Sequence, residues 1–350
     1  MPRIRAVTTA VPEHRIDQPT AREFARNLFS KSTPDINRLL PLFENAGIET
    51  RYFSASPDWF AAPHTLAEKN LMYIESATAL AAGAARQLLD EADLRPEQID
   101  YVIYVNTTGL ATPSIDARLI NVLGLRPDVR RTPIWGLGCA GGAAGLAHAY
   151  HHALGHPDQR ILVVAAELCG LTFLADDFSR SNLVATALFG EGAAAALVTG
   201  DALQSSGLEI LGTKSRFYPD SLDVMGWSVV ASGLQVVFAQ RIPAIVEANA
   251  AEDFVAFLAG HGLKLKDIDR FLIHPGGTKV IEAYESALNL TNGHMDLARE
   301  VLRDYGNMSS VTVLFVLERY IRQYGFDRGG HGLISALGPG FCSESLLVRL

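Results

Sequence analysis

The sequence of 350 residues is poor in charge, and basic residues are the scarcer kind. Charged residues make up 19% of the chain, and 30 basic against 38 acidic side chains give a net charge of −8. Binding to a phosphate backbone requires a basic surface, so a nucleic-acid partner is not expected. Apolar residues reach 48%, which excludes the low hydrophobicity typical of disordered proteins.

Cysteines and long apolar runs are also scarce. The three cysteines, Cys139, Cys169 and Cys342, are odd in number and far apart, and no two form a Cys-x-x-Cys pair. This argues against a disulfide scaffold and a structural zinc site, and it favours a reducing compartment. No segment reaches the roughly 20 apolar residues of a membrane helix, and the N-terminal region lacks the core of a secretory signal. We therefore expect a soluble, cytoplasmic protein with no integral membrane segment.

Helical and strand-like segments alternate along the chain, which predicts an α/β layered fold. Residues 76–92 and 244–259 are rich in alanine and favour helices. Apolar runs that favour strands lie at 101–105, 161–165, 193–198, 271–274 and 346–350. A turn rich in glycine and serine at 200–207 is the best candidate for a boundary. It would divide the chain into halves of residues 1–200 and 201–350.

A weak internal similarity points to duplication. Residues 97–104 resemble residues 266–273, which lie 169 positions later. The same offset brings Gly138-Cys139 onto Asn307-Met308, and each pair precedes an apolar helical segment. We interpret this as two similar halves. The alternative is that helix–loop–strand units resemble one another without a common origin.

Cys139 is the best candidate for a nucleophile. It follows a short apolar strand, is flanked by glycines and precedes an alanine-rich helix. Small neighbours permit a sharp turn at the helix N-terminus, where the helix dipole and free N–H groups favour a thiolate. The alternative is a small buried cysteine that packs as an apolar residue.

His274 is the best candidate among the ten histidines for a catalytic role. It ends an apolar strand, and Pro275 holds it in extended geometry, so its side chain leaves the strand in a fixed direction. A structural, partly buried histidine is the alternative. His148, His151 and His152 have helical spacing without further ligands, which predicts a solvated helix face and no metal site.

Asn307 follows Gly306 at the start of an apolar helix, a position where asparagine is common as a helix cap. If the two halves pack as a pseudo-twofold pair, Asn307 and Cys139 would converge with His274 between them. A thiolate paired with an imidazolium could then accept an acyl group, while His274 and Asn307 donate to a thioester oxygen. A Cys-His-Asn hydrolase would use the same residue types, and the spacing does not separate the two.

Five ordered motifs make the chain resemble the type III polyketide synthases, the chalcone-synthase-like branch of the thiolase-fold condensing enzymes. They lie at residues 137–142 (Leu-Gly-Cys-Ala-Gly-Gly), 187–195, 273–277 (Ile-His-Pro-Gly-Gly), 305–310 (Tyr-Gly-Asn-Met-Ser-Ser) and 337–341. The initiating ketoacyl-ACP synthases share the Cys-His-Asn order but resemble the chain less. The resemblance implies a homodimer of αβαβα subunits built from two similar halves.

The resemblance also implies roles for individual residues. Cys139 would carry the acyl chain, and His274 and Asn307 would promote decarboxylation of malonyl-CoA by stabilising the enolate. Phe189 would lie where the CoA tunnel meets the cavity. Substrate-binding positions are further implied for Val236, Cys169, Thr172, Thr112, Gly338 and Gly340.

Departures from the family pattern bear on the substrate. Val236 stands where plant members have a second phenylalanine gate, and Thr112 replaces a methionine that reaches across the dimer interface. The chain looks most like bacterial alkylresorcinol and alkylpyrone synthases. We therefore expect an acyltransferase that extends a long-chain fatty acyl starter with malonyl-CoA and uses no cofactor.

Several basic residues expected at the CoA rim are missing, so an acyl carrier protein is an alternative donor to acyl-CoA. A single ketoacyl-ACP synthase III-like condensation and thioester hydrolysis are the alternative functions.

Overall fold

The computed structural model describes residues 1–30, 35–203, 205–291, 293–326 and 328–350. Their strands form a large mixed sheet and two small antiparallel pairs, β2–β3 and β9–β10. The order in the large sheet is β11-β12-β13-β8-β1-β7-β6-β4-β5. The strand bounds are β1 (Arg3–Ala10), β2 (His14–Asp17), β3 (Thr50–Phe53), β4 (Tyr101–Asn106), β5 (Arg130–Trp135), β6 (Arg160–Leu168), β7 (Glu191–Thr199), β8 (Leu208–Phe217), β9 (Met225–Val230), β10 (Gly233–Phe238), β11 (Arg270–Ile273), β12 (His331–Gly338) and β13 (Cys342–Arg349).

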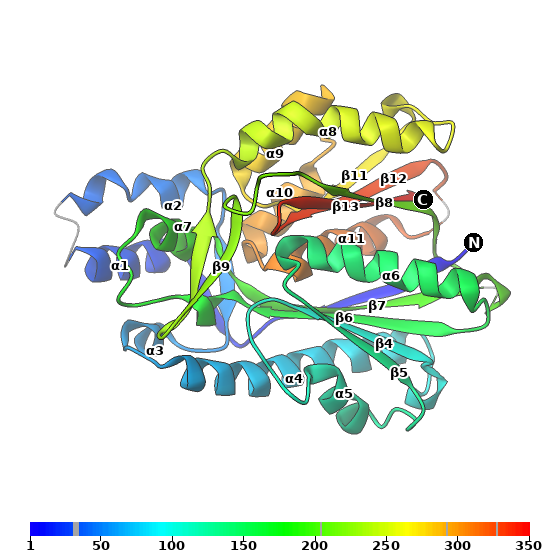
Figure 1. The fold of residues 1–350 in the computed structure, drawn as a ribbon, viewed down its shortest axis with the longest axis horizontal. Coiled ribbons are helices and arrows are strands. Elements are labelled where there is room, and N and C mark those ends of the chain that lie inside the picture. The colour runs from blue at the N-terminus through cyan, green and yellow to red at the C-terminus, as the bar shows by residue number, and fades with distance from the viewer. Residues whose placement is uncertain (31–34, 204, 292, 327) are drawn as a thin grey trace.

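Helices cover both faces of the sheet and fill the space between its two ends, which gives five layers (Figure 1). From bottom to top in that view the layers are α4 with α5, the β4–β7 end, α6 with α11, the β11–β13 end, and α8 with α9. The helix bounds are α1 (Gln18–Phe29), α2 (Pro41–Asn45), α3 (Pro57–Ala61), α4 (Leu66–Glu91), α5 (Ile115–Leu123), α6 (Gly141–Gly155), α7 (Arg180–Leu188), α8 (Ile242–Ala259), α9 (Thr278–Leu288), α10 (Asp296–Tyr305) and α11 (Thr312–Tyr324).

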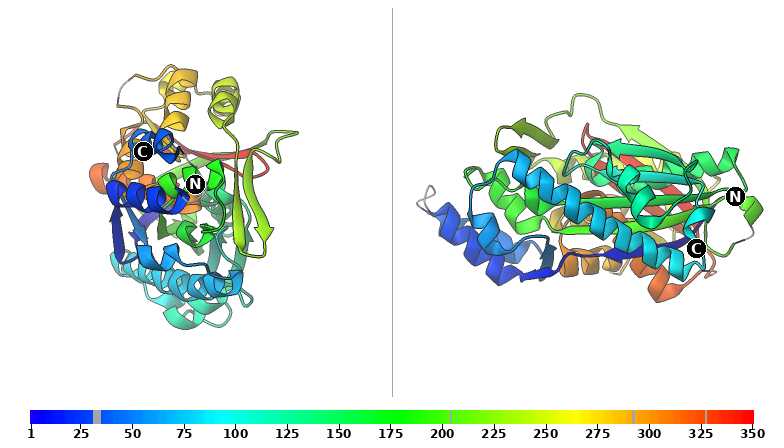
Figure 2. Two further views of the ribbon diagram at one scale, coloured as in Figure 1. Left: turned by 90° about the vertical axis from the view of Figure 1, so that its left-hand side faces the viewer. Right: turned by 90° about the horizontal axis from the view of Figure 1, so that it is seen from below.

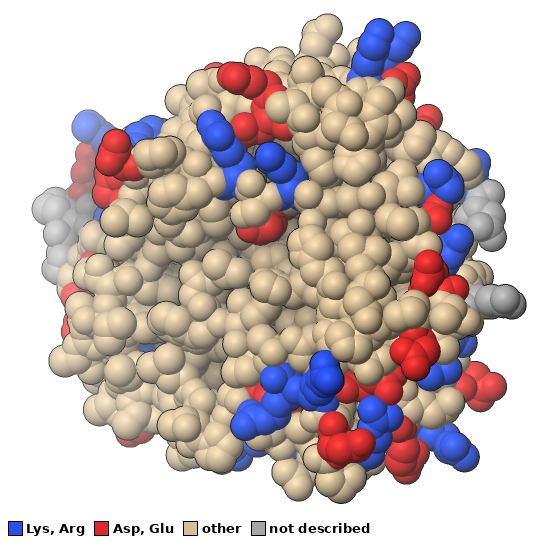
Figure 3. All heavy atoms as spheres, turned by 45° about the vertical axis from the view of Figure 1, so that its right-hand side comes forward, with Lys and Arg blue, Asp and Glu red and all other residues tan. Residues whose placement is uncertain are grey.

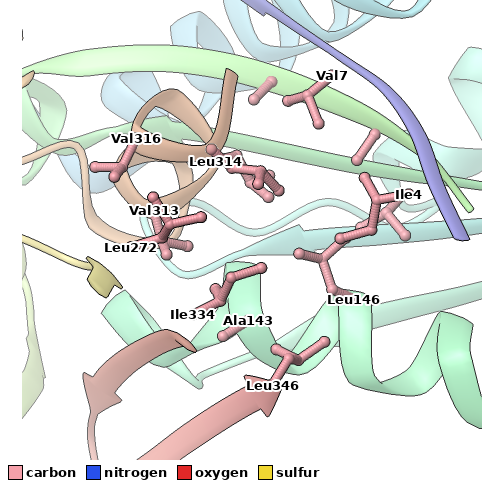
Figure 4. Packing of buried hydrophobic residues seen from close by; sticks show 14 of the residues in the cluster. Ile4, Val7, Ala143, Leu146, Leu272, Val313, Leu314, Val316, Ile334 and Leu346 are labelled. Carbon is pink, nitrogen blue, oxygen red and sulfur yellow. The ribbon is translucent and has the colours of Figure 1, made fainter. Parts of the chain in front are cut away.

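The central strands are apolar because both of their faces are buried. Ile103 of β4 belongs to the core around α6 and α11, whereas its neighbour Tyr104 belongs to the core between the sheet and α4. Side chains alternate between the faces of a strand, so such a strand must be apolar at successive positions. Figure 4 shows the central core, where Leu146 of α6 lies between Ile4 of β1 and Leu346 of β13.

The two ends of the sheet repeat one arrangement, which confirms the predicted thiolase-like αβαβα fold of two similar halves. Strands β4, β6, β7 and β1 are adjacent in that order, with one parallel and two antiparallel pairings. Strands β11, β12, β13 and β8 repeat the order and the pairings. The halves meet where β1 pairs with β8. We propose that the boundary lies near residue 200, between the end of β7 at Thr199 and the start of β8 at Leu208.

Two peripheral parts flank the sheet. Helices α1, α2 and α7 pack together at the left of Figure 1 around a separate apolar cluster. The β9–β10 hairpin runs along one side of the molecule and is drawn as yellow-green arrows in the left panel of Figure 2. The β9–β10 hairpin lines both of the cavities described below, and α1 and α7 line the larger one.

The surface carries its charges unevenly. Figure 3 shows a broad central area without charged side chains, bordered by Lys, Arg, Asp and Glu. Within the described residues, no helix combines the length and the apolarity that a membrane crossing demands.

Candidate active site

Cys139 lies in a single helical turn, Gly138–Ala140, between β5 and α6. Gly138 has a φ of +47°, a left-handed conformation that favours glycine, and its N–H donates to Thr107 Oγ1 at 2.9 Å. A Cβ at this position would lie 2.5 Å from Cδ of Pro339. The turn therefore requires glycine for its backbone angle and for its contact with the 338–340 segment.

Glycines at the start of α6 bring Cys139 close to the second half of the chain. A Cβ on Gly142 would lie 2.2 Å from the carbonyl oxygen of Ser310, and a Cβ on Gly141 would lie 2.6 Å from Val105. Any larger residue would push α6 away from β4 and from the start of α11. The run of small residues after Cys139 thus has a packing function.

His274 follows β11, and its backbone N–H donates to the carbonyl of Ser335 on β12 at 2.8 Å. The side chain is 4% exposed. Neither ring nitrogen has a hydrogen-bond partner among the described residues. Burial lowers the pKa of His274 to about 3, so the resting imidazole is neutral. A buried, unpartnered imidazole is available for a proton or a substrate oxygen.

Asn307 is held at both ends of its side-chain amide, between α10 and α11. Its Nδ2 donates to the carbonyl of Gly276 at 3.1 Å, and its Oδ1 accepts from the N–H of Ser309 at 2.8 Å. Oδ1 also lies 3.8 Å from Sγ of Cys139. One hydrogen of Nδ2 remains for a further acceptor. The amide is thus fixed next to the cysteine. It is also tied to the segment of His274, because Gly276 lies two residues after His274 in the chain.

Cys139, His274 and Asn307 line one cavity of about 310 Å³. Burial raises the pKa of Cys139 to about 12, and hydrogen bonds of its side chain with Ser309 and Asn307 oppose this shift. A lone thiolate or a lone imidazolium is therefore disfavoured here. Both groups line the same cavity, so transfer of the thiol proton to the imidazole would create the two opposite charges together, and each would stabilise the other. The other lining residues are Met225, Phe238, Ile242, Gly276, Val280 and Leu337.

A second, larger cavity of about 670 Å³ lies between α1, β3, α7 and β10. Four of the expected substrate-binding residues line it: Phe189, Val236, Cys169 and Thr172. The remaining lining is mostly aromatic and aliphatic, and Arg51 is its charged member. The other lining residues are Ile16, Thr20, Ala21, Phe24, Phe53, Pro57, Phe60, Gly170, Phe173, Asn182, Ala185 and Thr186.

The β9–β10 hairpin contributes residues to both cavities, and Phe189 of the larger cavity is adjacent to Asn307 of the smaller one. Phe189 forms an isolated β-bridge with Asn307, and its ring meets that of Trp227 edge to face at 6.1 Å. Val236 is paired with Trp227 across the hairpin and lines the larger cavity, whereas Phe238 lines the smaller one. One strand therefore contributes to both cavities.

The other expected substrate-binding residues lie outside these cavities. Thr112 is exposed in the loop before α5. Gly338 and Gly340 flank Pro339, and a Cβ on Gly338 would lie 2.2 Å from the carbonyl oxygen of Leu137. The 338–340 segment thus packs against the Cys139 turn, and it is Leu337 beside it that reaches the smaller cavity.

Sequence reasoning missed a buried carboxylate close to the cysteine. Glu167 accepts from the N–H groups of Thr107 and Thr108, from Thr108 Oγ1 and from Ser310 Oγ, at 2.7–3.1 Å. It thereby joins β6, the loop after β4 and the start of α11. A glutamate within the apolar run of β6 was the signal that could have identified it. Ser309, with a φ of +51° beside Asn307, was missed as well.

Two similar halves around a buried cysteine, histidine and asparagine place the protein in the thiolase-like fold class. The chain belongs to the chalcone and stilbene synthase family, the type III polyketide synthases. The family's N-terminal domain matches residues 2–202, and its C-terminal domain matches residues 209–350. The suspected family is thereby confirmed.

Relatives of this family cover nearly the whole chain. It is 40% identical to 1,3,6,8-tetrahydroxynaphthalene synthase from Streptomyces peucetius subsp. caesius, over 99% of this chain and 92% of that protein. It is 27% identical to the alpha-pyrone synthesis polyketide synthase-like Pks18 of Mycobacterium tuberculosis, over 99% and 91%. The solved structure of 1,3,6,8-tetrahydroxynaphthalene synthase from Streptomyces coelicolor A3(2), a bacterial type III polyketide synthase, matches with a TM-score of 0.94 at 30% identity, over 99% of both chains.

Proposed function

We propose that this type III polyketide synthase loads a long-chain fatty acyl starter onto Cys139, extends it with malonyl-CoA, and cyclises the product to an alkylresorcinol or an alkylpyrone. The observation that carries the choice of starter is the apolar cavity of about 670 Å³ behind Phe189 and Val236. Each methylene group transferred from water into such a cavity contributes about 0.8 kcal/mol. A long alkyl chain therefore gains more from it than an acetyl group does.

Loading uses the neutral pair described above. The thiol proton of Cys139 passes to His274, and the sulfur attacks the carbonyl carbon of the starter thioester. The bond between that carbon and the sulfur of the donor breaks, and the departing thiolate takes up the proton. Burial raises the pKa of Cys139 and lowers the pKa of His274, so both groups are neutral before the attack.

Extension uses the same cavity for decarboxylation. The bond between the carboxylate and the α-carbon of a malonyl thioester breaks, CO₂ leaves, and the electron pair forms an enolate. The free hydrogen of Asn307 Nδ2 and the ring of His274 donate to the enolate oxygen. One such donor typically contributes about 10²–10³ in rate. The enolate carbon then attacks the acyl group on Cys139, a carbon–carbon bond forms, and the sulfur leaves.

A starter series with purified protein and malonyl-CoA tests the proposal. We expect acyl donors of twelve to twenty carbons, the range assumed for a long alkyl chain, to outcompete acetyl and aromatic donors at about tenfold or more. Mass spectrometry of the products distinguishes resorcinols from pyrones. Preference for acetyl or aromatic donors would contradict the assignment, as would CoA release without longer products, which indicates a hydrolase. A single extension would indicate a ketoacyl-ACP synthase III-like reaction.

A second candidate product is a tetrahydroxynaphthalene, which the names of relatives at 40% and 30% identity favour. Such a ring carries no alkyl tail and would leave the larger cavity without an alkyl chain. Formation of a naphthalene from malonyl-CoA in the absence of any other donor would favour this candidate. Val236→Phe separates the two, because bulk at this wall should lower the use of long donors selectively. Val229→Phe on the exposed face of the same hairpin is the matched control.

We further propose that the protein acts in the cytoplasm as a homodimer with no cofactor besides its CoA substrates, and that acyl-CoA or an acyl carrier protein delivers the starter. Thr112, in the loop before α5, and Trp135, at the end of the edge strand β5, are exposed, the latter to 49%. Their exposure supports a dimer interface at this edge of the large sheet. Light scattering of the purified protein tests the dimer. The described residues contain no group of three His, Cys, Asp or Glu side chains placed to hold a metal ion.

A further inference from the structure

The last turn of α7 ends inside the protein, where its free carbonyl groups need donors. Three segments that lie far apart in the sequence supply the donors to these carbonyls. Each carbonyl from residue 186 to 189 accepts a hydrogen bond, from Arg51 Nη1 at Thr186 (2.6 Å) and Phe189 (3.0 Å), from Gln18 Nε2 at Ala187 (3.0 Å) and from the Asn307 backbone at Leu188 (2.8 Å).

Arg51 is a buried cation that lacks a carboxylate partner among the described residues. It is 1% exposed, its Nη2 donates to Gln18 Oε1 at 2.9 Å, and its guanidinium lies 5.5 Å from the ring of Phe53. The negative end of the α7 dipole provides the compensating charge. Burial lowers the pKa of Arg51 to about 9, which leaves it charged at neutral pH.

The cap made by Arg51 is continuous with the backbone of Asn307. The N–H of Asn307 donates to the Leu188 carbonyl at 2.8 Å, and its carbonyl accepts from Gly190 at 2.9 Å. The arginine stem also fills the space beside Gly306, where a Cβ would lie 2.8 Å from its Cγ and Cδ. The end of α7 and the segment that carries Asn307 are therefore held together around one side chain.

We infer that Arg51 is a positioning residue for the polyketide synthase reaction, because its cap on α7 holds the amide of Asn307 at the sulfur of Cys139 and the ring of Phe189 between the two cavities. The inference rests on the proposed role of Asn307 in decarboxylation. Arg51 acts through Asn307 and does not touch the reacting atoms.

The geometry of the guanidinium is essential to this role. Its two contacts with the carbonyls of Thr186 and Phe189 come from one nitrogen, while the other terminal nitrogen reaches Gln18. Lysine keeps the charge but offers a single compact ammonium group without the planar fork. Methionine keeps much of the stem and loses every donor. Arg51→Lys should therefore be intermediate between the wild type and Arg51→Met.

Decarboxylation of malonyl-CoA and alkylation of Cys139 by iodoacetamide are the two readouts. We expect Arg51→Met to lower kcat for decarboxylation about 10²-fold, the effect of one misplaced donor, with little change in KM or in the alkylation rate. Arg15→Met is the matched control, since Arg15 lies on the paired strand β2 with an exposed side chain. Parallel losses of decarboxylation and alkylation would mean a general structural defect and would overturn the inference.

A double-mutant cycle with Asn307 is the decisive measurement. If Arg51 acts through Asn307, the variant carrying both Arg51→Met and Asn307→Ala decarboxylates no more slowly than Asn307→Ala alone. If the rate losses of the two single variants multiply in the double variant, the inference is overturned. Should Arg51→Met fail to fold, Gln18→Ala removes the neighbouring part of the cap. Its smaller loss of decarboxylation rate must likewise disappear when it is combined with Asn307→Ala. Wild-type decarboxylation by Asn307→Ala itself would instead overturn the proposed function, and the inference with it.

Discussion

Replacing Glu191 with glutamine is expected to stabilise the protein at alkaline pH relative to acidic pH. Glu191 is fully buried at the start of β7. Its Oε2 accepts from the N–H of Ser54 at 2.6 Å, while Oε1 has no hydrogen-bond partner among the described residues. Burial raises the pKa of this carboxyl from 4.5 to about 7, because the ionised form is poorly solvated.

The sign of the effect follows from proton binding. Below pH 4.5 the carboxyl is protonated in both the folded and the unfolded chain. Between 4.5 and about 7 only the unfolded chain releases the proton, so a rise in pH favours unfolding. Above pH 7 the loss is complete, and at about 1.4 kcal/mol per pKa unit it amounts to about 3 kcal/mol. Glutamine stays neutral and does not incur this loss.

The measurement is urea unfolding of wild type and Glu191→Gln at pH 5 and pH 8.5, followed by tryptophan fluorescence. Any effect of the glutamine amide itself on the free energy of unfolding is present at both pH values. The change, between the two pH values, in the difference between variant and wild type therefore reports the ionisation of Glu191 alone. We expect the variant to gain about 2–3 kcal/mol relative to wild type between the two conditions. The exposed Glu282→Gln on α9 controls for the loss of one negative charge. Equal differences at both pH values would refute the reasoning.

The other predictions concern packing and chemistry. Gly142→Ala should destabilise the protein by about 3 kcal/mol or more, because its Cβ would lie 2.2 Å from the Ser310 carbonyl. Gly83→Ala, in open space on α4, should stabilise it by about 0.5–1 kcal/mol; thermal melts of the pair test both. Cys139→Ala should abolish the acyl-enzyme seen by intact-protein mass spectrometry while the melting temperature stays near that of wild type. Asn307→Ala should lower decarboxylation about 10²–10³-fold and spare loading, and a comparable loss of both would contradict its role.

Motifs in the sequence were sufficient to predict the fold and the three residues of the smaller cavity. Cys139 and Asn307 each follow a glycine before an apolar segment, and the duplication relates these two segments between the halves. His274 was identified separately, from its position at the end of an apolar strand before Pro275. Glycines near Cys139 were attributed to the turn alone. Their second function, contact with Pro339 and Ser310, depends on residues about 170–200 positions away and has no local signal.

Other parts of the site depend on tertiary contacts that the sequence does not encode in any short segment. Arg51 reads as an ordinary charged residue in a strand, and only the approach of α7 makes it a helix cap. Phe189 and Val236 were expected as substrate-binding residues, but Trp227, which pairs with Val236, could not be placed without the pairing of β9 and β10. Gly338 was expected at a substrate-binding position, and its contact with the cysteine turn, where a Cβ would lie 2.2 Å from the carbonyl oxygen of Leu137, has no signal in the sequence.

The position of β13 constrains how the chain can be synthesised and folded. Although it is the most C-terminal strand, β13 lies between β12 and β8 inside the sheet and contributes Leu346 and Val348 to the core shared by both halves. While the chain is still emerging from a ribosome, β8 and β12 lack the strand that joins them, and α6 and α11 remain partly uncovered. Loss of the eight residues of β13 would remove an interior strand, so a chain that lacks them should yield a chaperone-bound or aggregated product instead of a slightly shortened enzyme.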